Sequence, residues 1–415
     1  MAAPAASALP LRQVLAYGLP GLPLAFAALP LYVHVPPFYA AVTGMELALL
    51  GAILLGARLL DALIDPWLGW LADRKPRRQM LALALLPFAA GFVALLNPPP
   101  EHAAPWLLAS LTLTYLGFSA ATVAYQAWGA DVGSDSALRT RLTAAREGFG
   151  LLGVMLAAAL PGLLASDTTS GTARLAWVLP PLLLVAALAA FTSVGAGSPQ
   201  RREAAPLAPS LKRVFADVAF RRLLLVFIAN GIAAALSATL FLFFVADVLQ
   251  AEAAGGPLLA LYFIAGAASL PLWVRLAAAR GRAMAWLAAM GLAMLSFAGA
   301  GLLGPGDVTA FAAICLLSGL ALGADLSLPA AMAADLGERQ GQAGACFGVW
   351  NFAAKLNLAL AAGLALPLLG GLGYVPGGSV GVPALTFAYA LLPLGCKAVA
   401  AALLWRWRHS LEIPS

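Results

Sequence analysis

Charged residues are scarce in this sequence: Asp, Glu, Lys and Arg make up 10% of its 415 residues, whereas 62% are hydrophobic. A soluble protein carries about 25% charged residues. The mean hydropathy here is +0.91. The composition therefore argues against a soluble domain and predicts a multi-pass membrane protein, most of which lies in the lipid bilayer.

Cysteine and histidine are also rare, with three of each. Cys315, Cys346 and Cys396 lie in apolar runs at unrelated spacings, which argues against a disulfide framework or a metal site. The sequence contains no nucleophile elbow, phosphate-binding loop, metal triad or base–nucleophile pair that we recognise. We therefore expect neither an enzyme nor a resident cofactor.

A signal peptide is not expected at the N-terminus. The first residues carry only Arg12, and no small-residue cleavage pattern follows a short apolar core. We interpret the first apolar stretch as the first membrane span.

Apolar runs of about 20 residues recur along the chain and predict twelve membrane-spanning helices. The runs lie near residues 11–33, 44–71, 79–97, 106–130, 146–166, 174–195, 223–248, 257–279, 283–303, 309–334, 345–370 and 384–405. The longest polar stretch separates the sixth run from the seventh. We predict an all-α integral membrane protein with six-helix bundles at 1–195 and 223–415, joined by a linker at 196–222. Within the linker, residues 210–220 suit an amphipathic interfacial helix.

Basic residues gather in every second loop. They are Arg74, Lys75, Arg77, Arg78, Arg139, Arg141, Arg201, Arg202, Lys212, Arg213, Arg221, Arg222, Arg280, Arg282, Arg339, Arg406 and Arg408, whereas the opposite side has only Arg174. The positive-inside rule then places both termini and the linker in the cytoplasm, and we expect the cell (inner) membrane. Because the charges are spread over separate loops, they do not predict a nucleic-acid-binding face.

Six plus six spans around a cytoplasmic loop are the architecture of the major facilitator superfamily. The segment Gly69-Trp-Leu-Ala-Asp73-Arg-Lys-Pro-Arg-Arg resembles the cytoplasmic signature of that superfamily. Gly69 permits close helix contact, and Asp73 is expected to cap a neighbouring helix or to pair with arginines as a latch. The candidate cytoplasmic gating residues are Gly69, Asp73, Arg74, Arg77, Arg78, Arg139 and Arg141.

Three charged residues lie inside the second apolar run: Arg58, Asp61 and Asp65. Their spacing places all three on one stripe of a helix. A charge at mid-membrane costs about 2.5–3.5 kcal/mol on insertion scales, so we expect them to face each other, water or a bound ion. Two carboxylates one turn apart suit Na⁺, Li⁺ or H⁺, and Arg58 can pair with either acid when the cation leaves. A purely structural Arg–Asp pair is the alternative.

The same run resembles the second span of the glycoside–pentoside–hexuronide:cation symporters, the melibiose permease-like family. The resemblance lies in Arg58-x-x-Asp61-x-x-x-Asp65-Pro66-x-x-Gly69. Residues 125–131, 139–150, 333–335 and 347–356 resemble later segments of the family, in the same order. The resemblance implies cation-coupled symport of a sugar or glycoside-like solute by alternating access.

The resemblance also implies roles for single residues. Asp61 and Asp65 match the coupling-cation carboxylates, and Na⁺ is one candidate ion there. Trp128 matches the aromatic residue of the sugar site, Arg146 an arginine at the start of the fifth span, and Lys355 a lysine that faces the cavity. With residues that the sequence itself suggests, the candidates for substrate binding or coupling are Arg58, Tyr125, Trp128, Arg146, Asn230, Asp325, Asn351 and Lys355.

Asp325 is an additional charge in the tenth span. It is expected to pair with Lys355, to bind a cationic group of the substrate or to take part in proton transfer. Asn230, in the seventh span, is a candidate cavity-side polar group. Lys397 we interpret as a structural or snorkelling residue.

Three positions depart from the family pattern. Where melibiose permease-like members carry acids in the first and fourth spans, this chain has Ala25 and Ala124. A hydroxyl-rich sugar needs several polar partners, so a lysolipid-like or other amphiphilic cargo is an alternative. Ile64 replaces a polar group that often precedes Asp65 in Na⁺-coupled relatives, which favours H⁺.

A membrane scaffold that transports nothing is a further alternative on the same fold. It predicts that the carboxylates of the second span are structural. For the transporter we expect a monomer in the lipid bilayer, with a small-molecule substrate and a monovalent cation as partners and no nucleic acid.

Overall fold

The structure is a computed structural model that describes residues 9–45, 47–99, 101–166, 168–197, 206–374 and 381–412. These residues form helices and connecting turns, and none of them is in a strand. Within this part, nine helices are long and apolar enough to cross a membrane. The predicted all-α membrane class is confirmed.

Contacts divide the chain into two compact units. Unit 1 is Met1–Val214 with Ala333–Phe352, and unit 2 is Phe215–Met332 with Ala353–Ser415. Residues 333–352 thus belong with the N-terminal unit, although the sequence pattern places them in the second bundle. The predicted bundles at 1–195 and 223–415 stay a prediction, and part of the linker, residues 198–205, lies outside the described residues.

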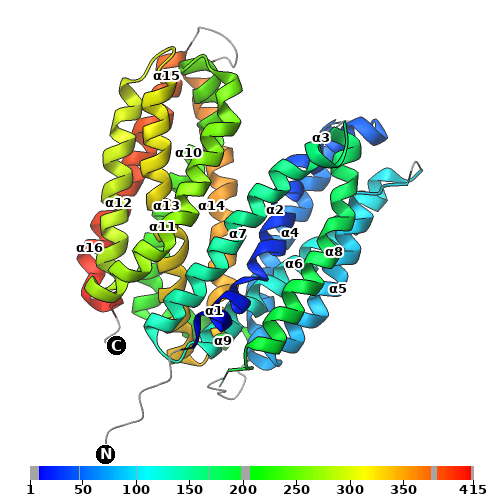
Figure 1. The fold of residues 1–415 in the computed structure, drawn as a ribbon, viewed down its shortest axis with the longest axis vertical. Coiled ribbons are helices and arrows are strands. Elements are labelled where there is room, and N and C mark those ends of the chain that lie inside the picture. Colours follow the sequence, from blue (N-terminus) through cyan, green and yellow to red (C-terminus); the bar gives the residue numbers. More distant parts are fainter. Residues whose placement is uncertain are drawn as a thin grey trace, which may run out of the picture. The chain divides into compact units, whose positions relative to one another are not determined.

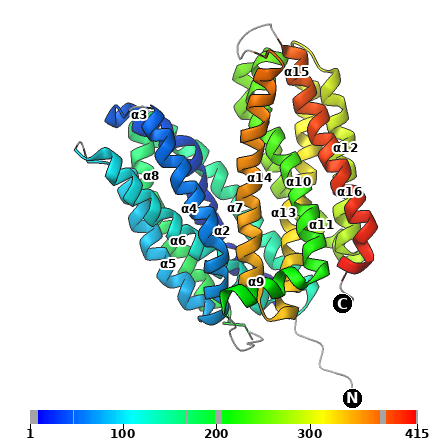
Figure 2. The same ribbon diagram turned by 180° about the vertical axis from the view of Figure 1, so that it is seen from behind.

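The helices of the N-terminal part follow the predicted spans from the second span onward. In chain order they are α1 Leu11–Gly18, α2 Gly21–Leu29, the π-helical turn η1 Pro30–His34, α3 Val35–Thr43, α4 Leu47–Arg74, α5 Arg77–Leu95, α6 Ala103–Val132, α7 Ser136–Leu164, α8 Thr168–Ser193 and α9 Leu207–Ala216. In unit 1, α5 packs against α6 and α8 (Figures 1 and 2).

The first predicted span, 11–33, is not one straight helix. It is interrupted at two prolines: Pro20 precedes α2, and Pro30 opens η1. A proline has no backbone N–H, so it cannot donate the hydrogen bond that would continue the preceding turn. The next helix, α3, ends at Thr43. Gly44, which follows it, has a φ of +63°, a left-handed conformation that glycine adopts without strain.

Helices α5 and α6 pack closely against each other in unit 1. A Cβ atom added at Gly91 would lie 2.7 Å from the backbone nitrogen of Thr114, and one at Gly117 would lie 2.4 Å from that of Phe88. In a membrane the hydrophobic effect does not drive helices together, so helix association depends on van der Waals packing. Small residues favour it because they let the helix backbones approach closely. This pairing fixes α6, which carries several candidate site residues.

The C-terminal part contains the remaining helices. They are α10 Val218–Phe243, the π turn η2 Phe244–Val248, the 3₁₀ turn η3 Glu252–Ala254, α11 Gly255–Arg280, α12 Arg282–Ala298, the 3₁₀ turn η4 Gly299–Leu302, α13 Val308–Gln340, α14 Ala343–Gly371, α15 Val382–Thr386, the π turn η5 Phe387–Leu391 and α16 Leu392–Leu411. In unit 2, α16 packs against α10 and α12, as both ribbon views show. Its core includes Phe244 and Tyr389, whose rings stack at 4.2 Å.

The predicted amphipathic helix in the linker is present but shorter than residues 210–220. Helix α9 ends at Ala216, and Asp217 begins α10 by accepting hydrogen bonds from the backbone N–H groups of Ala219 (2.7 Å) and Phe220 (3.1 Å). An aspartate with this geometry is a strong N-cap. The break therefore has a local cause in the sequence.

Candidate transport site

Helix α4 carries the two candidate cation ligands, and both are buried. Asp61 is 5% exposed and Asp65 is 0% exposed, whereas Arg58 on the preceding turn is exposed. The Ser119 hydroxyl, from α6, donates to the Asp61 carboxylate at 2.5 Å. Tyr115, also on α6, lies close enough to Arg58 and Asp61 to interact electrostatically with both. The α4–α6 contact thus brings a third oxygen ligand beside the predicted pair.

Helix α14 approaches α4 at three glycines. A Cβ atom at Gly69 would lie 2.3 Å from the carbonyl oxygen of Gly344, and one at Gly348 would lie 2.5 Å from that of Asp65. Gly344 and Gly348 form a G-x-x-x-G pattern that presents a flat backbone face. The close contact expected of Gly69 is present, and it brings the backbone of α14 against the Asp65 turn.

Asp73 lies near the C-terminal end of α4 and caps the first turn of α14. Its carboxylate accepts hydrogen bonds from the backbone N–H groups of Gly344 (2.7 Å) and Ala345 (2.8 Å). The first N–H groups of a helix have no partner inside the helix, and the helix dipole favours a negative charge there. A side chain far away in the sequence therefore serves as the N-cap of α14.

Arg77 connects this cap to α6. One guanidinium nitrogen lies 3.0 Å from Asp73, and the other donates to the carboxylate of Asp131 and to the carbonyl of Ala127 at 2.7 Å. All three ionised side chains are largely buried. Buried charges in a shared network are costly to separate, because removal of one leaves the others uncompensated.

The other candidate gating arginines have separate partners. Arg139 lies 2.9 Å from Asp335, near the end of α13. The Arg74 guanidinium lies 3.9 Å from the ring centroid of Trp70, a cation–π geometry. Arg141, on α7, is half-buried. The predicted gating set is thus spread over several contacts at the ends of α4, α5, α7 and α13.

Trp128 is packed inside unit 1. Its indole N–H donates to the carbonyl of Gly195 at 3.0 Å, and its ring contacts those of Tyr17 and Phe191 at 5.5 and 5.8 Å. The guanidinium of Arg78 lies 5.5 Å from the same ring and donates to the carbonyl of Phe191 at 2.6 Å. Trp128 is 0% exposed, so in this conformation its ring packs against protein on all sides.

Tyr125 and Arg146 lie in the same part of unit 1. Tyr125 and Tyr17 each donate a hydroxyl hydrogen bond to the other's backbone carbonyl, with the rings 4.9 Å apart. Arg146 pairs with its neighbour Glu147 at 2.6 Å. The two tyrosines thus link α1 to α6, and the charge of Arg146 is compensated by a carboxylate on its own helix, α7.

Two candidates on α14 lie one turn apart. The Asn351 amide donates to the side-chain oxygen of Gln126 at 2.9 Å, within unit 1. Lys355, in unit 2, is half-buried. Gln126 is a polar partner that the sequence analysis did not single out.

Asp325 pairs with Lys397 instead of Lys355. The carboxylate lies 2.8 Å from the Lys397 ammonium and accepts from the Trp286 indole at 2.7 Å. The same ammonium donates to Asn230 at 2.7 Å. The expected Asp325–Lys355 pair is therefore wrong, because in unit 2 Lys397 of α16 faces Asp325 of α13.

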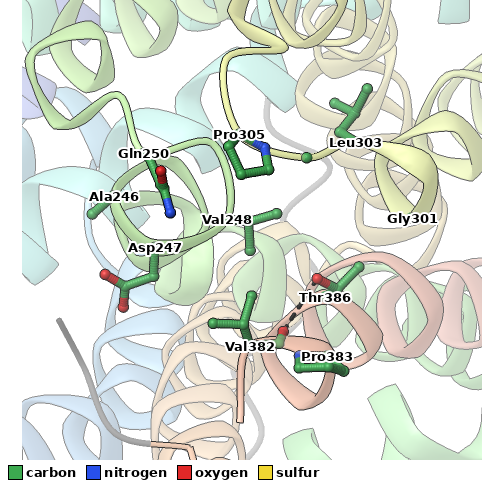
Figure 3. A pocket seen from close by; sticks show the side chains of 11 residues that line it. Ala246, Asp247, Val248, Gln250, Gly301, Leu303, Pro305, Val382, Pro383 and Thr386 are labelled. Atoms are coloured by element: carbon green, nitrogen blue, oxygen red, sulfur yellow. Dashed lines mark hydrogen bonds between the residues drawn. The ribbon is translucent and has the colours of Figure 1, made fainter. Parts of the chain in front are cut away.

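A hollow of about 640 Å³ lies where α10, α12 and α15 end in unit 2 (Figure 3). Its lining includes Asp247 and Thr386. The Thr386 hydroxyl donates back to the Val382 carbonyl (3.2 Å), and Asp247 accepts from the Tyr374 hydroxyl. Burial and the neighbouring Asp247 carboxylate raise the pKa of Tyr374, so this phenol keeps its proton and donates throughout the physiological pH range. Asp247 and Thr386 thus have protein partners, and we assign no ligand to this hollow.

Besides Gln126, the sequence analysis did not single out Ser119 or Asp131, and it interpreted Lys397 as a structural or snorkelling residue. Ser119 is a lone hydroxyl in an apolar run, which is more often bonded to its own helix. Asp131 directly follows the predicted fourth span, where solvation is the usual outcome, and Lys397 lies inside the predicted twelfth span, where a lysine can snorkel. Only the contacts between helices show that these side chains bind other candidate residues. In the described part of the chain no three His, Cys, Asp or Glu side chains converge as a metal site.

Comparison with known proteins places the fold. A family model described as MFS/sugar transport protein matches residues 16–410. No curated protein matches the chain. Among solved structures, the E. coli fucose:proton symporter is 16% identical, with a TM-score of 0.73 and coverage of 97% of this chain and 99% of that one.

Two further solved structures have the same fold. A bacterial homologue of the iron transporter ferroportin is 16% identical, with a TM-score of 0.71 and coverage of 97% and 100%. The proton:xylose symporter is 14% identical, with a TM-score of 0.70 and coverage of 96% and 94%. At these identities the likeness concerns the fold, and the narrower melibiose permease-like resemblance stays a prediction. The chain therefore belongs to the MFS/sugar transport protein family and has the major facilitator fold.

Proposed function

We propose that this protein is a secondary active symporter that couples the entry of a cation, H⁺ or Na⁺, to the transport of a small organic solute by alternating access. One observation carries the proposal: Asp61 and Asp65 are both buried on one stripe of α4, with the Ser119 hydroxyl beside Asp61. The family membership alone names neither the coupling ion nor the transported solute, and both are part of this proposal.

The chemistry of this cluster suits a monovalent cation. A buried carboxylate is stable only when its charge is compensated or its proton is retained. Na⁺ prefers oxygen ligands, which Asp61, Asp65 and Ser119 supply, and H⁺ needs only one of the two carboxylates. Loading of either ion neutralises the stripe before the helices move.

The cap at Asp73 gives the cycle a contact that must open. When the first turn of α14 leaves α4, the N–H groups of Gly344 and Ala345 lose their partner and gain water. Arg77 remains to hold Asp73 and Asp131 together. We infer that this cap is the cytoplasmic latch and that cation loading biases its opening.

The cargo is a sugar or glycoside-like solute if the family description holds for this chain. The position of Trp128 supports the amphiphilic alternative instead, because its ring is packed and its N–H is bonded to Gly195. Ala25 and Ala124 likewise offer no hydrogen bond to a hydroxyl-rich ligand. A lysolipid-like amphiphile is therefore the second candidate cargo.

The experiment is uptake into proteoliposomes under an imposed pH or Na⁺ gradient, with a panel of sugars, alkyl glycosides and lysolipids. We expect Asp61→Asn and Asp65→Asn each to lower gradient-driven uptake at least about tenfold, because an amide neither releases a proton nor adds negative charge to a Na⁺ site. Glu252→Gln, the same change at an exposed turn, is the matched control. Gradient-driven uptake that survives both substitutions refutes the coupling role, and the absence of uptake for every solute favours the scaffold alternative.

A further inference from the structure

Unit 2 contains a cavity of its own, lined by α10 to α14 and α16. Its volume is about 430 Å³, within the range of about 300–1,000 Å³ that small-molecule sites occupy. Most of its wall is aromatic or aliphatic and includes Phe227, Phe241, Tyr262, Phe263, Phe297 and Leu322. Such a wall binds an apolar body and offers little to a polyol.

One part of the cavity wall is polar but has no net charge. Lys397 lies 2.8 Å from Asp325 and 2.7 Å from the side-chain oxygen of Asn230. An ammonium group has three donors, so one remains after these two contacts. The pair neutralises itself, and a ligand with a net charge would bury that charge without compensation.

Asn357 supplies the observation that points to a ligand. It lines the cavity and is 4% exposed, yet neither its amide nitrogen nor its amide oxygen has a hydrogen-bond partner among the described residues. A buried amide left without partners is destabilising, and few such groups occur in native proteins.

The neighbouring helix leaves room for this amide. A Cβ atom at Gly231 would lie 2.1 Å from the Asn357 side-chain nitrogen. A side chain at position 231 would therefore displace the amide, and glycine keeps it at the cavity wall. A donor and an acceptor are thus held beside an apolar cavity with nothing in the described protein to bind.

We propose that this cavity is a binding site for an uncharged amphiphile. The apolar body of the ligand lies among the aromatic side chains, and a hydroxyl or ester head binds Asn357 and the remaining donor of Lys397. The site lies wholly in unit 2, whereas the carboxylates of α4 belong to unit 1. The proposal therefore stands whether or not cation coupling is found.

The test uses full-length protein in lipid nanodiscs and three probes with the same eight-carbon chain. Mono-octanoyl glycerol is uncharged, octanoate is an anion and octylamine is a cation. We expect the uncharged probe to raise the thermal unfolding midpoint of the wild type more than either charged probe, because a ligand that binds only the folded state stabilises it.

Variants locate the effect in the cavity. Asn357→Leu removes the unsatisfied amide, so we expect an unfolding midpoint without ligand that is unchanged or raised, and a Kd for mono-octanoyl glycerol at least about tenfold weaker. Ala238→Phe, which fills the cavity without a polar change, is expected to weaken binding similarly. Asn97→Leu, at an exposed helix end where the amide bonds only to Val93, is the matched control.

Because the probes also partition into lipid, the comparison among variants decides the result. A shift that is equal in all variants is a bilayer effect and overturns the proposal. So does a larger shift with octanoate or octylamine, or no shift at all, which would mean that the cavity holds only water. Gradient-driven uptake is a separate readout, so failure here and failure of the symport proposal are distinguishable.

Discussion

Single side chains near the C-terminal end of α4 each bind groups on more than one helix. Asp73 belongs to α4, yet it caps α14 and pairs with Arg77 of α5. Arg77 in turn reaches Asp131 of α6. Because each charge compensates several groups, the effect of a substitution depends on which of these groups remain satisfied.

Substitutions of Asp73 separate the cap from the charge. We expect Asp73→Ala to lower stability by about 1–3 kcal/mol, because it leaves two helix N–H groups without their acceptor, while Arg77 keeps Asp131 as a partner. Asp73→Asn keeps an acceptor for the helix and is expected to cost about 1–2 kcal/mol less than the alanine change. Thermal or denaturant unfolding of the purified variants measures both.

The control for Asp73 is Asp135→Asn. Asp135 caps its own helix, α7, through the backbone N–H of Leu138, and asparagine caps as well as aspartate. We expect no measurable change there. Equal stability of Asp73→Ala and the wild type would contradict the cap.

At the scale of elements, backbone contact between α4 and α14 decides how the Asp65 turn is covered. Gly69, Gly344 and Gly348 have no side chains, so the two helices approach until carbonyl oxygens and Cα atoms meet. The sequence pattern predicts the contact at Gly69 but not its partner. That partner is set by where α14 begins, which Asp73 fixes by capping its first turn.

Gly344→Ala tests this contact. The new methyl group would lie 2.3 Å from the carbonyl of Gly69, so the helices must separate, and we expect a loss of about 1–3 kcal/mol. Gly291→Ala, at a position with nothing within 4 Å, is the control and is expected to be neutral or stabilising by up to about 1 kcal/mol. Equal unfolding midpoints for the two variants would mean that α4 and α14 are not held in contact.

For the whole molecule, the distribution of basic residues predicts one orientation in the membrane. The turn around Ser134, between α6 and α7, is on the basic side, and the turn around Glu252, between α10 and α11, is on the other. Both residues are exposed. The orientation follows from loop charge and not from helix packing.

Cysteine labelling in intact cells tests the orientation. We expect Glu252→Cys to react with a membrane-impermeant maleimide from outside, and Ser134→Cys to react only after the cells are permeabilised. The wild type, whose three cysteines are buried or half-buried, gives the background. The reverse labelling pattern would place both termini outside the cell.

The sequence alone determined the membrane class, and it predicts the spans and their orientation, because these depend on hydropathy and loop charge summed over many residues. It also indicated Asp61 and Asp65, since charges in an apolar run stand out by their cost. The tertiary structure decided which polar groups meet: Ser119 with Asp61, Asp73 with the start of α14, and Lys397 instead of Lys355 with Asp325. These pairings depend on helix rotation and register, which neighbouring side chains fix only when the bundle is packed.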